Sequence, residues 1–174
     1  MAENENAQTQ DNQQPQQAGE PQPIFQLQRC YLKDASLEMP HAPEILMQAQ
    51  QENPQVDIQF EVSQRPVAEA LWDVTVRGTI TVKAAEKAII LVEGKQSGIF
   101  AIHGIPDEAM QHVTNVICPT MVYPYLRANL ADLMTRANVP PVHLPEVNFE
   151  VLYQQRLAQA QAEAEAAKAQ AQTN

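Results

Sequence analysis

The stretch from Cys118 to Leu157 constrains the fold of this chain more than any other segment. Apolar residues spaced three and four apart indicate two helices, one on each side of a proline-rich connector. The apolar positions are Leu126, Leu130, Leu133, Met134 and Ala137 in the first helix, and Phe149, Leu152, Tyr153 and Leu157 in the second. Each helix is therefore expected to bury one stripe, and neither carries a cluster of groups typical of catalysis.

Four segments before these helices have the composition and spacing of β-strands: residues 24–39, 56–63, 72–82 and 88–102. In the first of them, strict alternation predicts one shared face for Phe25, Leu27, Arg29 and Tyr31. Strands that precede helices along a chain favour an α+β fold over the βαβ units of a parallel sheet. We expect an antiparallel sheet of about four strands, followed by two helices.

Glycines and prolines predict interruptions within these elements. Gly78 in the third strand predicts a bulge or a close neighbouring backbone. Gly94 and Gly98 predict breaks in the fourth strand. Prolines interrupt the first helix, so we expect a break just before Pro119 and a kink near Pro124.

The two ends of the chain differ in composition from its middle. Residues 1–23 are rich in Gln, Asn, Pro and Glu, and burial cannot offset the entropy lost on ordering such a segment. Residues 158–174 are almost wholly Ala, Gln and Glu, so the second helix can continue into them. We expect one folded domain at 24–157, between a disordered acidic, Gln-rich tail and a partly helical Ala/Gln-rich tail.

Charge and cysteine content favour some environments and partners over others. The formal net charge is -10 and the basic residues are scattered singly, which argues against nucleic acid and favours basic partners. Neither a signal sequence nor an apolar run of membrane-spanning length is visible, so we expect a cytoplasmic protein without direct membrane insertion. Cys30 and Cys118 lie alone on apolar stretches, which favours buried thiols in a reducing compartment.

No sequence pattern typical of an active site or a metal centre is present. The 4 histidines lie far apart, with no His-x-x-His pair, so we expect no metal and no cofactor. The 5 glycines form no phosphate-binding loop. Cys118 is expected to be an inert buried thiol, because it lies in an apolar stretch. The sequence therefore argues against an enzyme.

Several blocks of this chain resemble the SecB family of protein-export chaperones. They are FQLQRCYLKDASLEMPHAP at 25–43, GIFAIHGI at 98–105, and the helical block with its Cys-Pro, Pro-Tyr and Val-Asn-Phe. The resemblance covers residues 25–157. It implies a homotetramer, a dimer of dimers, with an antiparallel sheet and two helices in each subunit. It also implies a function, which is to hold unfolded precursor proteins in the cytoplasm and to deliver them to the SecA motor.

The resemblance further implies roles for particular residues. Contact with SecA is implied for Asp34, Glu38, Leu91 and Glu93. A groove for client proteins, walled by the second strand and roofed by the second helix, is implied for Val56, Ile58, Phe60, Phe149, Leu152 and Tyr153. A subunit interface is implied for Val92, Gln96, Tyr123, Tyr125, Leu126, Leu130 and Met134. Both tails depart from the family pattern, which leaves open whether the trailing tail contacts SecA.

The residues by themselves leave alternatives open. Most surface carboxylates are ordinary solvated charges, and each groove residue could equally belong to the core. The apolar surplus also allows a different class of protein, a carrier that holds a small apolar ligand, such as a fatty acid, in a cavity of the sheet. A carrier should bind one compact ligand per subunit, whereas a chaperone should bind long unfolded chains across several subunits.

Overall fold

The structure, a computed structural model, describes residues 23–48, 53–84 and 87–171. In chain order, its elements are β1 (Ile24–Glu38), α1 (Glu44–Gln48), β2 (Gln55–Ala68), β3 (Leu71–Ala84), β4 (Lys87–His103), α2 (Asp107–His112), the π-helical segment η2 (Val113–Ile117), α3 (Cys118–Arg136) and α4 (Phe149–Ala171). Residues 1–22, which make up nearly all of the tail predicted to be disordered, lie outside the described residues. The expected α+β order of strands before helices is confirmed.

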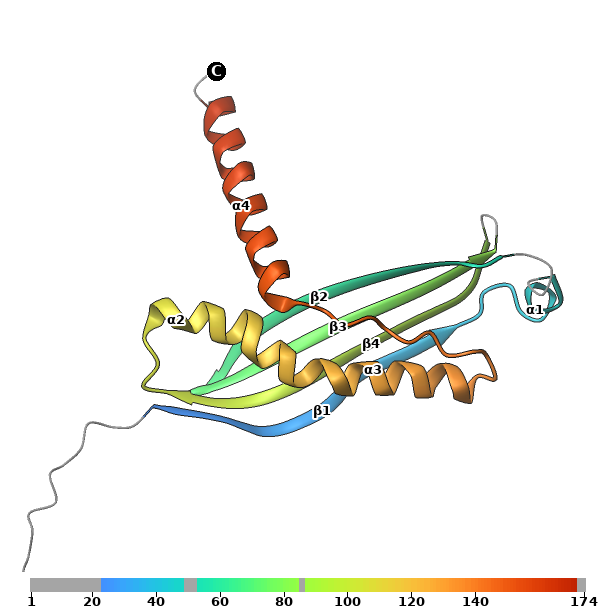
Figure 1. The fold of residues 1–174 in the computed structure, drawn as a ribbon, viewed down its shortest axis with the longest axis horizontal. Helices are drawn as coiled ribbons and strands as arrows, with labels where there is room; N and C mark the ends of the chain where they lie inside the picture. The colour runs from blue at the N-terminus through green and yellow to red at the C-terminus, as the bar shows by residue number, and fades with distance from the viewer. Residues whose placement is uncertain (1–22, 49–52, 85–86, 172–174) are drawn as a thin grey trace, which may run out of the picture.

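The strands form one antiparallel sheet in the order β1-β4-β3-β2 (Figure 1). β1 and β2 are consecutive in the chain but form the two opposite edges, and the connection between them passes through α1. β3 and β4 lie in the centre and pair on both sides. The prediction of a four-stranded antiparallel sheet is therefore confirmed.

The edge strand β1 departs from the strict alternation that its sequence suggested. Its register against β4 shifts between Leu27 and Arg29. A register shift of this kind inserts one extra residue and turns the following side chains to the other face of the sheet. The prediction that Arg29 and Tyr31 share a face with Leu27 is therefore wrong. Tyr31 instead donates a hydrogen bond to Oδ1 of Asp73 on β3, over 3.3 Å.

Helical residues run without interruption from 107 to 136 and cover one face of the sheet (Figure 1). We call this the covered face, and the opposite one the open face. The expected break before Pro119 is absent, because η2 supplies a π-helical stretch that joins α2 to α3. Pro119 directly follows this π-helical stretch, as the second residue of α3. α3 also stays helical through Pro124.

The strand glycines lie beneath α3. Gly78 and Gly94 are paired across β3 and β4, without a register shift. A Cβ atom on Gly94 would lie 2.8 Å from Cδ2 of Leu130, and one on Gly78 would lie 3.1 Å from Cδ2 of Leu126. These glycines therefore let the helix approach the sheet closely. The predicted breaks at Gly94 and Gly98 are wrong, because β4 continues through both positions.

The core lies between the covered face and α3. Its largest fully buried side chains include Phe100, Ile80, Ile90, Leu126, Leu130 and Met134. Three of these come from α3, which confirms the stripe predicted from the helical spacing. The hydroxyl of Tyr123 donates a hydrogen bond to the carbonyl oxygen of Pro145, over 2.6 Å, and so ties the connector to α3.

α4 packs against the body of the protein through its first turns only. Phe149 is buried, and the guanidinium of Arg156 donates a hydrogen bond to the carbonyl oxygen of Val62 on β2, over 3.3 Å. Nε2 of His112 and Oε2 of Glu150 lie 2.6 Å apart. From Leu157 onward the described side chains are exposed, and the helix projects away from the sheet (Figure 1). No helix in the described part of the chain is both long and apolar enough to cross a membrane.

Candidate functional site

An apolar pocket with a volume of ≈ 590 Å³ lies at the surface of the protein, beside β2. Its lining comes from α1, the strands, the end of α3 and the connector, and includes Leu46, Val56, Ile90, Met134, Val139 and Val142. None of the described residues that line it is charged. A pocket of this kind attracts apolar groups without selecting one particular shape.

The residues predicted to form a client groove fall into two groups in the structure. Val56, which is 46% exposed, lines the apolar pocket. Ile58 and Phe60 follow it on β2 and are half-buried. The ring of Phe60 meets the ring of Tyr123 edge-on at 5.5 Å, and Tyr123 meets Phe149 in the same way at 5.5 Å. Phe60 is thus joined to a buried aromatic cluster rather than to the pocket itself.

The remaining predicted groove residues lie on α4. Leu152 packs against the core, and Tyr153 is half-buried. Phe149 is only 3% exposed, so in one protomer it is a core residue. The roles of all six residues in client binding stay predictions.

The sequence analysis missed the part that the connector plays in the pocket. Residues 139–142, Val-Pro-Pro-Val, form one wall. The backbone N–H of Val142 donates a hydrogen bond to Sδ of Met134 over 3.4 Å, which holds this wall against α3. The signal in the sequence was a run of four apolar residues without a charge, which is unusual for a plain surface linker.

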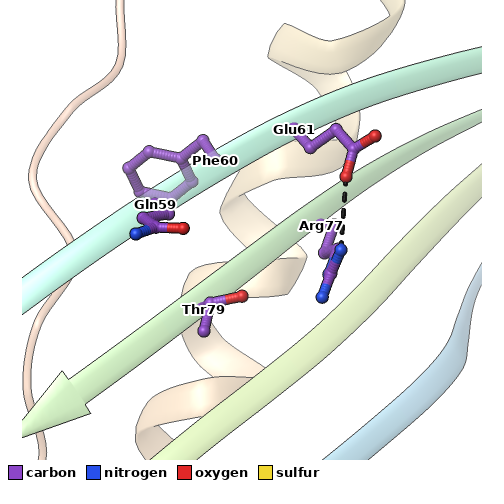
Figure 2. A pocket seen from close by; sticks show the side chains of 5 residues that line it. All are labelled: Gln59, Phe60, Glu61, Arg77 and Thr79. Atoms are coloured by element: carbon purple, nitrogen blue, oxygen red, sulfur yellow. Dashed lines mark hydrogen bonds and ion pairs between the residues drawn. The ribbon is translucent and has the colours of Figure 1, made fainter.

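The open face of the sheet carries a network of charged side chains. Nη2 of Arg77 lies 2.6 Å from Oε2 of Glu93, and Nη1 of Arg77 lies 3.4 Å from Oε2 of Glu61. Nζ of Lys95 lies 3.0 Å from Oδ2 of Asp34 and 3.6 Å from Oε1 of Glu93. We call these five residues the ion-pair network. Figure 2 shows the pair between Glu61 and Arg77. Both residues line a hollow on β2 and β3, which has a volume of ≈ 290 Å³.

The four residues predicted to contact SecA come together on this open face. Glu38 lies opposite Leu91 in the pairing of β1 with β4, and Asp34 lies opposite Lys95. Residues paired directly across two strands share a face, so the carboxylates and Leu91 lie on the open face along the paired stretches of β1 and β4. The hydrogen bond from Arg77 holds the pKa of Glu93 below its usual value. The sequence analysis missed the two cations, Arg77 and Lys95. Arg77 meets Glu93 through the pairing of β3 with β4, and Lys95, two residues after Glu93, meets Asp34 through the pairing of β1 with β4.

A second cluster on the open face surrounds Asp73. This carboxylate is 2% exposed, and its Oδ2 lies 2.9 Å from Nζ of Lys33 and 3.2 Å from Nη2 of Arg65. Its partners come from both edge strands, so the cluster ties β1 and β2 to the centre of the sheet. The sequence analysis did not identify it.

Most residues predicted to form a subunit interface are already buried within one protomer. Val92 and Gln96 are 0% and 3% exposed beneath α3. Oε1 of Gln96 accepts a hydrogen bond from Asn129 over 2.8 Å, and its Nε2 donates one to Sγ of Cys30 over 3.3 Å. Four α3 residues of the predicted interface are also buried: Tyr123, Leu126, Leu130 and Met134.

One residue of that set, Tyr125, is 52% exposed. It continues a row of exposed apolar side chains at Ile117, 39% exposed, and Met121, 38% exposed. The three lie four residues apart, on one side of the helical run. We call them the exposed stripe. They are candidates for contact with another subunit, and the sequence analysis had identified Tyr125 alone.

The two cysteines are free thiols that differ in burial. Cys118 is fully buried, which confirms the prediction of a buried thiol at that position, and burial raises the pKa of its thiol to about 12. Cys30 is only partly buried, so the prediction of a buried thiol is wrong at that position. Among the described residues, no group of three or more His, Cys, Asp or Glu could hold a metal ion.

Comparison with known proteins connects these surfaces to a family. The family model described as preprotein translocase subunit SecB matches residues 18–160. The protein-export protein SecB of Janthinobacterium sp. (strain Marseille) is 54% identical over 136 residues, which cover 78% of this chain and 82% of the relative. The protein-export protein SecB of Ralstonia pickettii (strain 12J) is 50% identical over 150 residues, which cover 86% of each chain.

A solved structure shows the same fold at low sequence identity. It is the Mycobacterium tuberculosis Rv1957 SecB-like chaperone in complex with a ChAD peptide from the Rv1956 HigA1 antitoxin. It matches with a TM-score of 0.58 and 16% identity, over 71% of this chain and 90% of that chain. Since the family model and the relatives cover most of the sequence, the chain belongs to the SecB family of protein-export proteins.

Proposed function

We propose that this protein is a chaperone of protein export, which binds unfolded precursor proteins in the cytoplasm and delivers them to the SecA motor. Its membership of the SecB family supports a role in export. The observation that carries the chaperone role is the uncharged apolar pocket beside β2. Most of its described lining side chains are apolar, and none of them carries a charge that would select one particular ligand.

The physical properties of this region suit a client without a fixed fold. Apolar burial is non-directional, so many different sequences can gain affinity from the same surface. β2 is an edge strand, and an extended client segment can pair with the backbone groups of an edge. Val56 belongs both to the edge strand and to the pocket, so the two modes of binding can act on one client.

We also propose assembly as a homotetramer, a dimer of dimers. The exposed stripe supports this proposal, because three large apolar side chains in a row on one helical surface favour burial against another subunit. The buried residues of the predicted interface would then act indirectly, by fixing the position of α3.

For the open face, the proposed role is docking of SecA. The side chain of Asp34 is 55% exposed, and Leu91, which lies opposite Glu38, is partly exposed. A group of carboxylates with an apolar neighbour suits a basic docking segment, and such a contact forms rapidly and weakens in salt.

The chaperone role predicts that a charge in the pocket impairs client binding. Val56→Asp should raise the dissociation constant for a reduced, unfolded precursor about tenfold, which is about 1.4 kcal/mol. The reason is that client apolar groups would have to desolvate the new carboxylate. Fluorescence anisotropy of the labelled precursor measures this change. The melting temperature should stay nearly constant, because Val56 is 46% exposed.

A matched control is Gln59→Asp, which places the same charge on the same strand but on the open face. It should bind the precursor like the unsubstituted protein. Equal binding by Val56→Asp would show that the pocket does not hold clients. If the protein bound one fatty acid per protomer and formed no complex with the precursor, the carrier alternative would replace the chaperone role.

A further inference from the structure

Two lysines on the open face pair with carboxylates that differ in their exposure to solvent. Lys95 lies 3.0 Å from Asp34, whose side chain is 55% exposed, and 3.6 Å from Glu93, whose side chain is 22% exposed. Lys33 lies 2.9 Å from Asp73, which is 2% exposed. A partner that approaches this face can reach the carboxylates that pair with Lys95, but it cannot reach the carboxylate that pairs with Lys33.

The ammonium of Lys95 occupies the position that a docking cation would need. It bridges the exposed Asp34 on β1 and the partly buried Glu93 on β4. Arg77 holds Glu93 from the other side, through Oε2 at 2.6 Å, so Oε1 of Glu93 is the oxygen shared with Lys95. The hydrogen bond with Asp34 raises the pKa of Lys95, so the bridge is charged at neutral pH.

We propose that Lys95 is an internal competitor on the SecA docking face. Its single positive charge partly offsets the negative charges of Asp34 and Glu93 in the free protein, and a cationic side chain of SecA has to displace it. The inference depends on the docking role proposed above. Displacement is possible because an exposed ion pair contributes little free energy and both partners can regain water. Lys95 therefore keeps the docking contact weak, and it favours a partner whose basic residues can replace one ammonium between two carboxylates.

The experiment is a titration of SecA against Lys95→Gln and Lys33→Gln. Both changes remove one positive charge from the same face of the sheet, so they alter the net charge equally. Lys95→Gln should bind SecA about two- to fivefold more tightly at low salt, the range of one exposed ion pair. The gain should shrink as the ionic strength rises. Lys33→Gln should bind like the unsubstituted protein, because the carboxylate that it frees is buried.

A second set of variants separates this inference from the docking role. Asp34→Asn combined with Glu93→Gln should weaken SecA binding, and adding Lys95→Gln to that pair should change nothing further. If the acidic pair weakens binding but Lys95→Gln alone does not strengthen it, the competitor role is overturned and the docking face stands. An equal gain from Lys33→Gln also overturns it, since the effect would be one of net charge. If the acidic pair binds SecA normally, the docking face fails, and the inference fails with it.

Discussion

Val92→Asp should destabilise the protomer by at least about 3 kcal/mol, because it places an unpaired carboxylate in the core. Val92 is 0% exposed, and it lies opposite Ile80 and Leu37 on the neighbouring strands, beneath α3. A loss of this size lowers the melting temperature of a chain of this length by roughly 6–12 °C. Thermal unfolding followed by circular dichroism measures it.

The adjacent residue provides the control. Leu91 lies on the open face and is partly exposed, so Leu91→Asp should change the melting temperature by only a few degrees. A Val92→Asp protein that melts normally but sediments as a smaller assembly would contradict the core assignment. It would show that Val92 acts directly between subunits, as the family resemblance implied.

Tyr125→Glu should dissociate the proposed tetramer while each protomer stays folded. Tyr125 is 52% exposed in the protomer, so the charge costs little there. In an assembly that buries the exposed stripe, the same carboxylate would be desolvated in every copy. Loss of a central aromatic residue typically costs about 2 kcal/mol or more, which raises the dissociation constant at least about thirtyfold. Native mass spectrometry over a dilution series gives the assembly state.

Thr135→Glu is the matched control for this prediction. It adds the same charge to an exposed position near the end of α3, ten residues beyond Tyr125. It should leave the assembly intact. An unchanged mass for Tyr125→Glu at every dilution would remove the exposed stripe from the interface, and the subunits would then have to meet through another surface.

The spacing of apolar residues along the sequence predicted which side of α3 is buried. Leu126, Leu130 and Met134 share one side of a helix through their spacing alone, and all three are buried. The face of Tyr31 could not be predicted in this way. A bulge upstream of it adds one residue, and that residue, Gln28, is as polar as its neighbour Gln26. Alternation therefore looks the same with and without the bulge.

The residues of the open face could likewise be predicted only in part from the sequence. Family resemblance pointed to Asp34 and Glu93, and both lie on the open face. It did not indicate Lys95, which is 61 residues from its partner Asp34 and meets it only through the register of β1 and β4. Burial of Gln96 likewise depends on where α3 lies on the sheet, which no pattern within β4 reveals.

The facing glycines Gly78 and Gly94 have a consequence for how the protomer folds. Glycine loses more backbone entropy on ordering than other residues and offers no side chain to its neighbours, so the middle of the β3–β4 hairpin is weak by itself. The missing apolar contact is supplied by Leu126 and Leu130 of α3. Hairpin and helix should therefore form in one cooperative step, and amide hydrogen exchange should give both the same opening free energy. A lower value for α3 alone would show that the hairpin persists without it. Under the expected result, no stable intermediate contains the central strands without the helix that completes them.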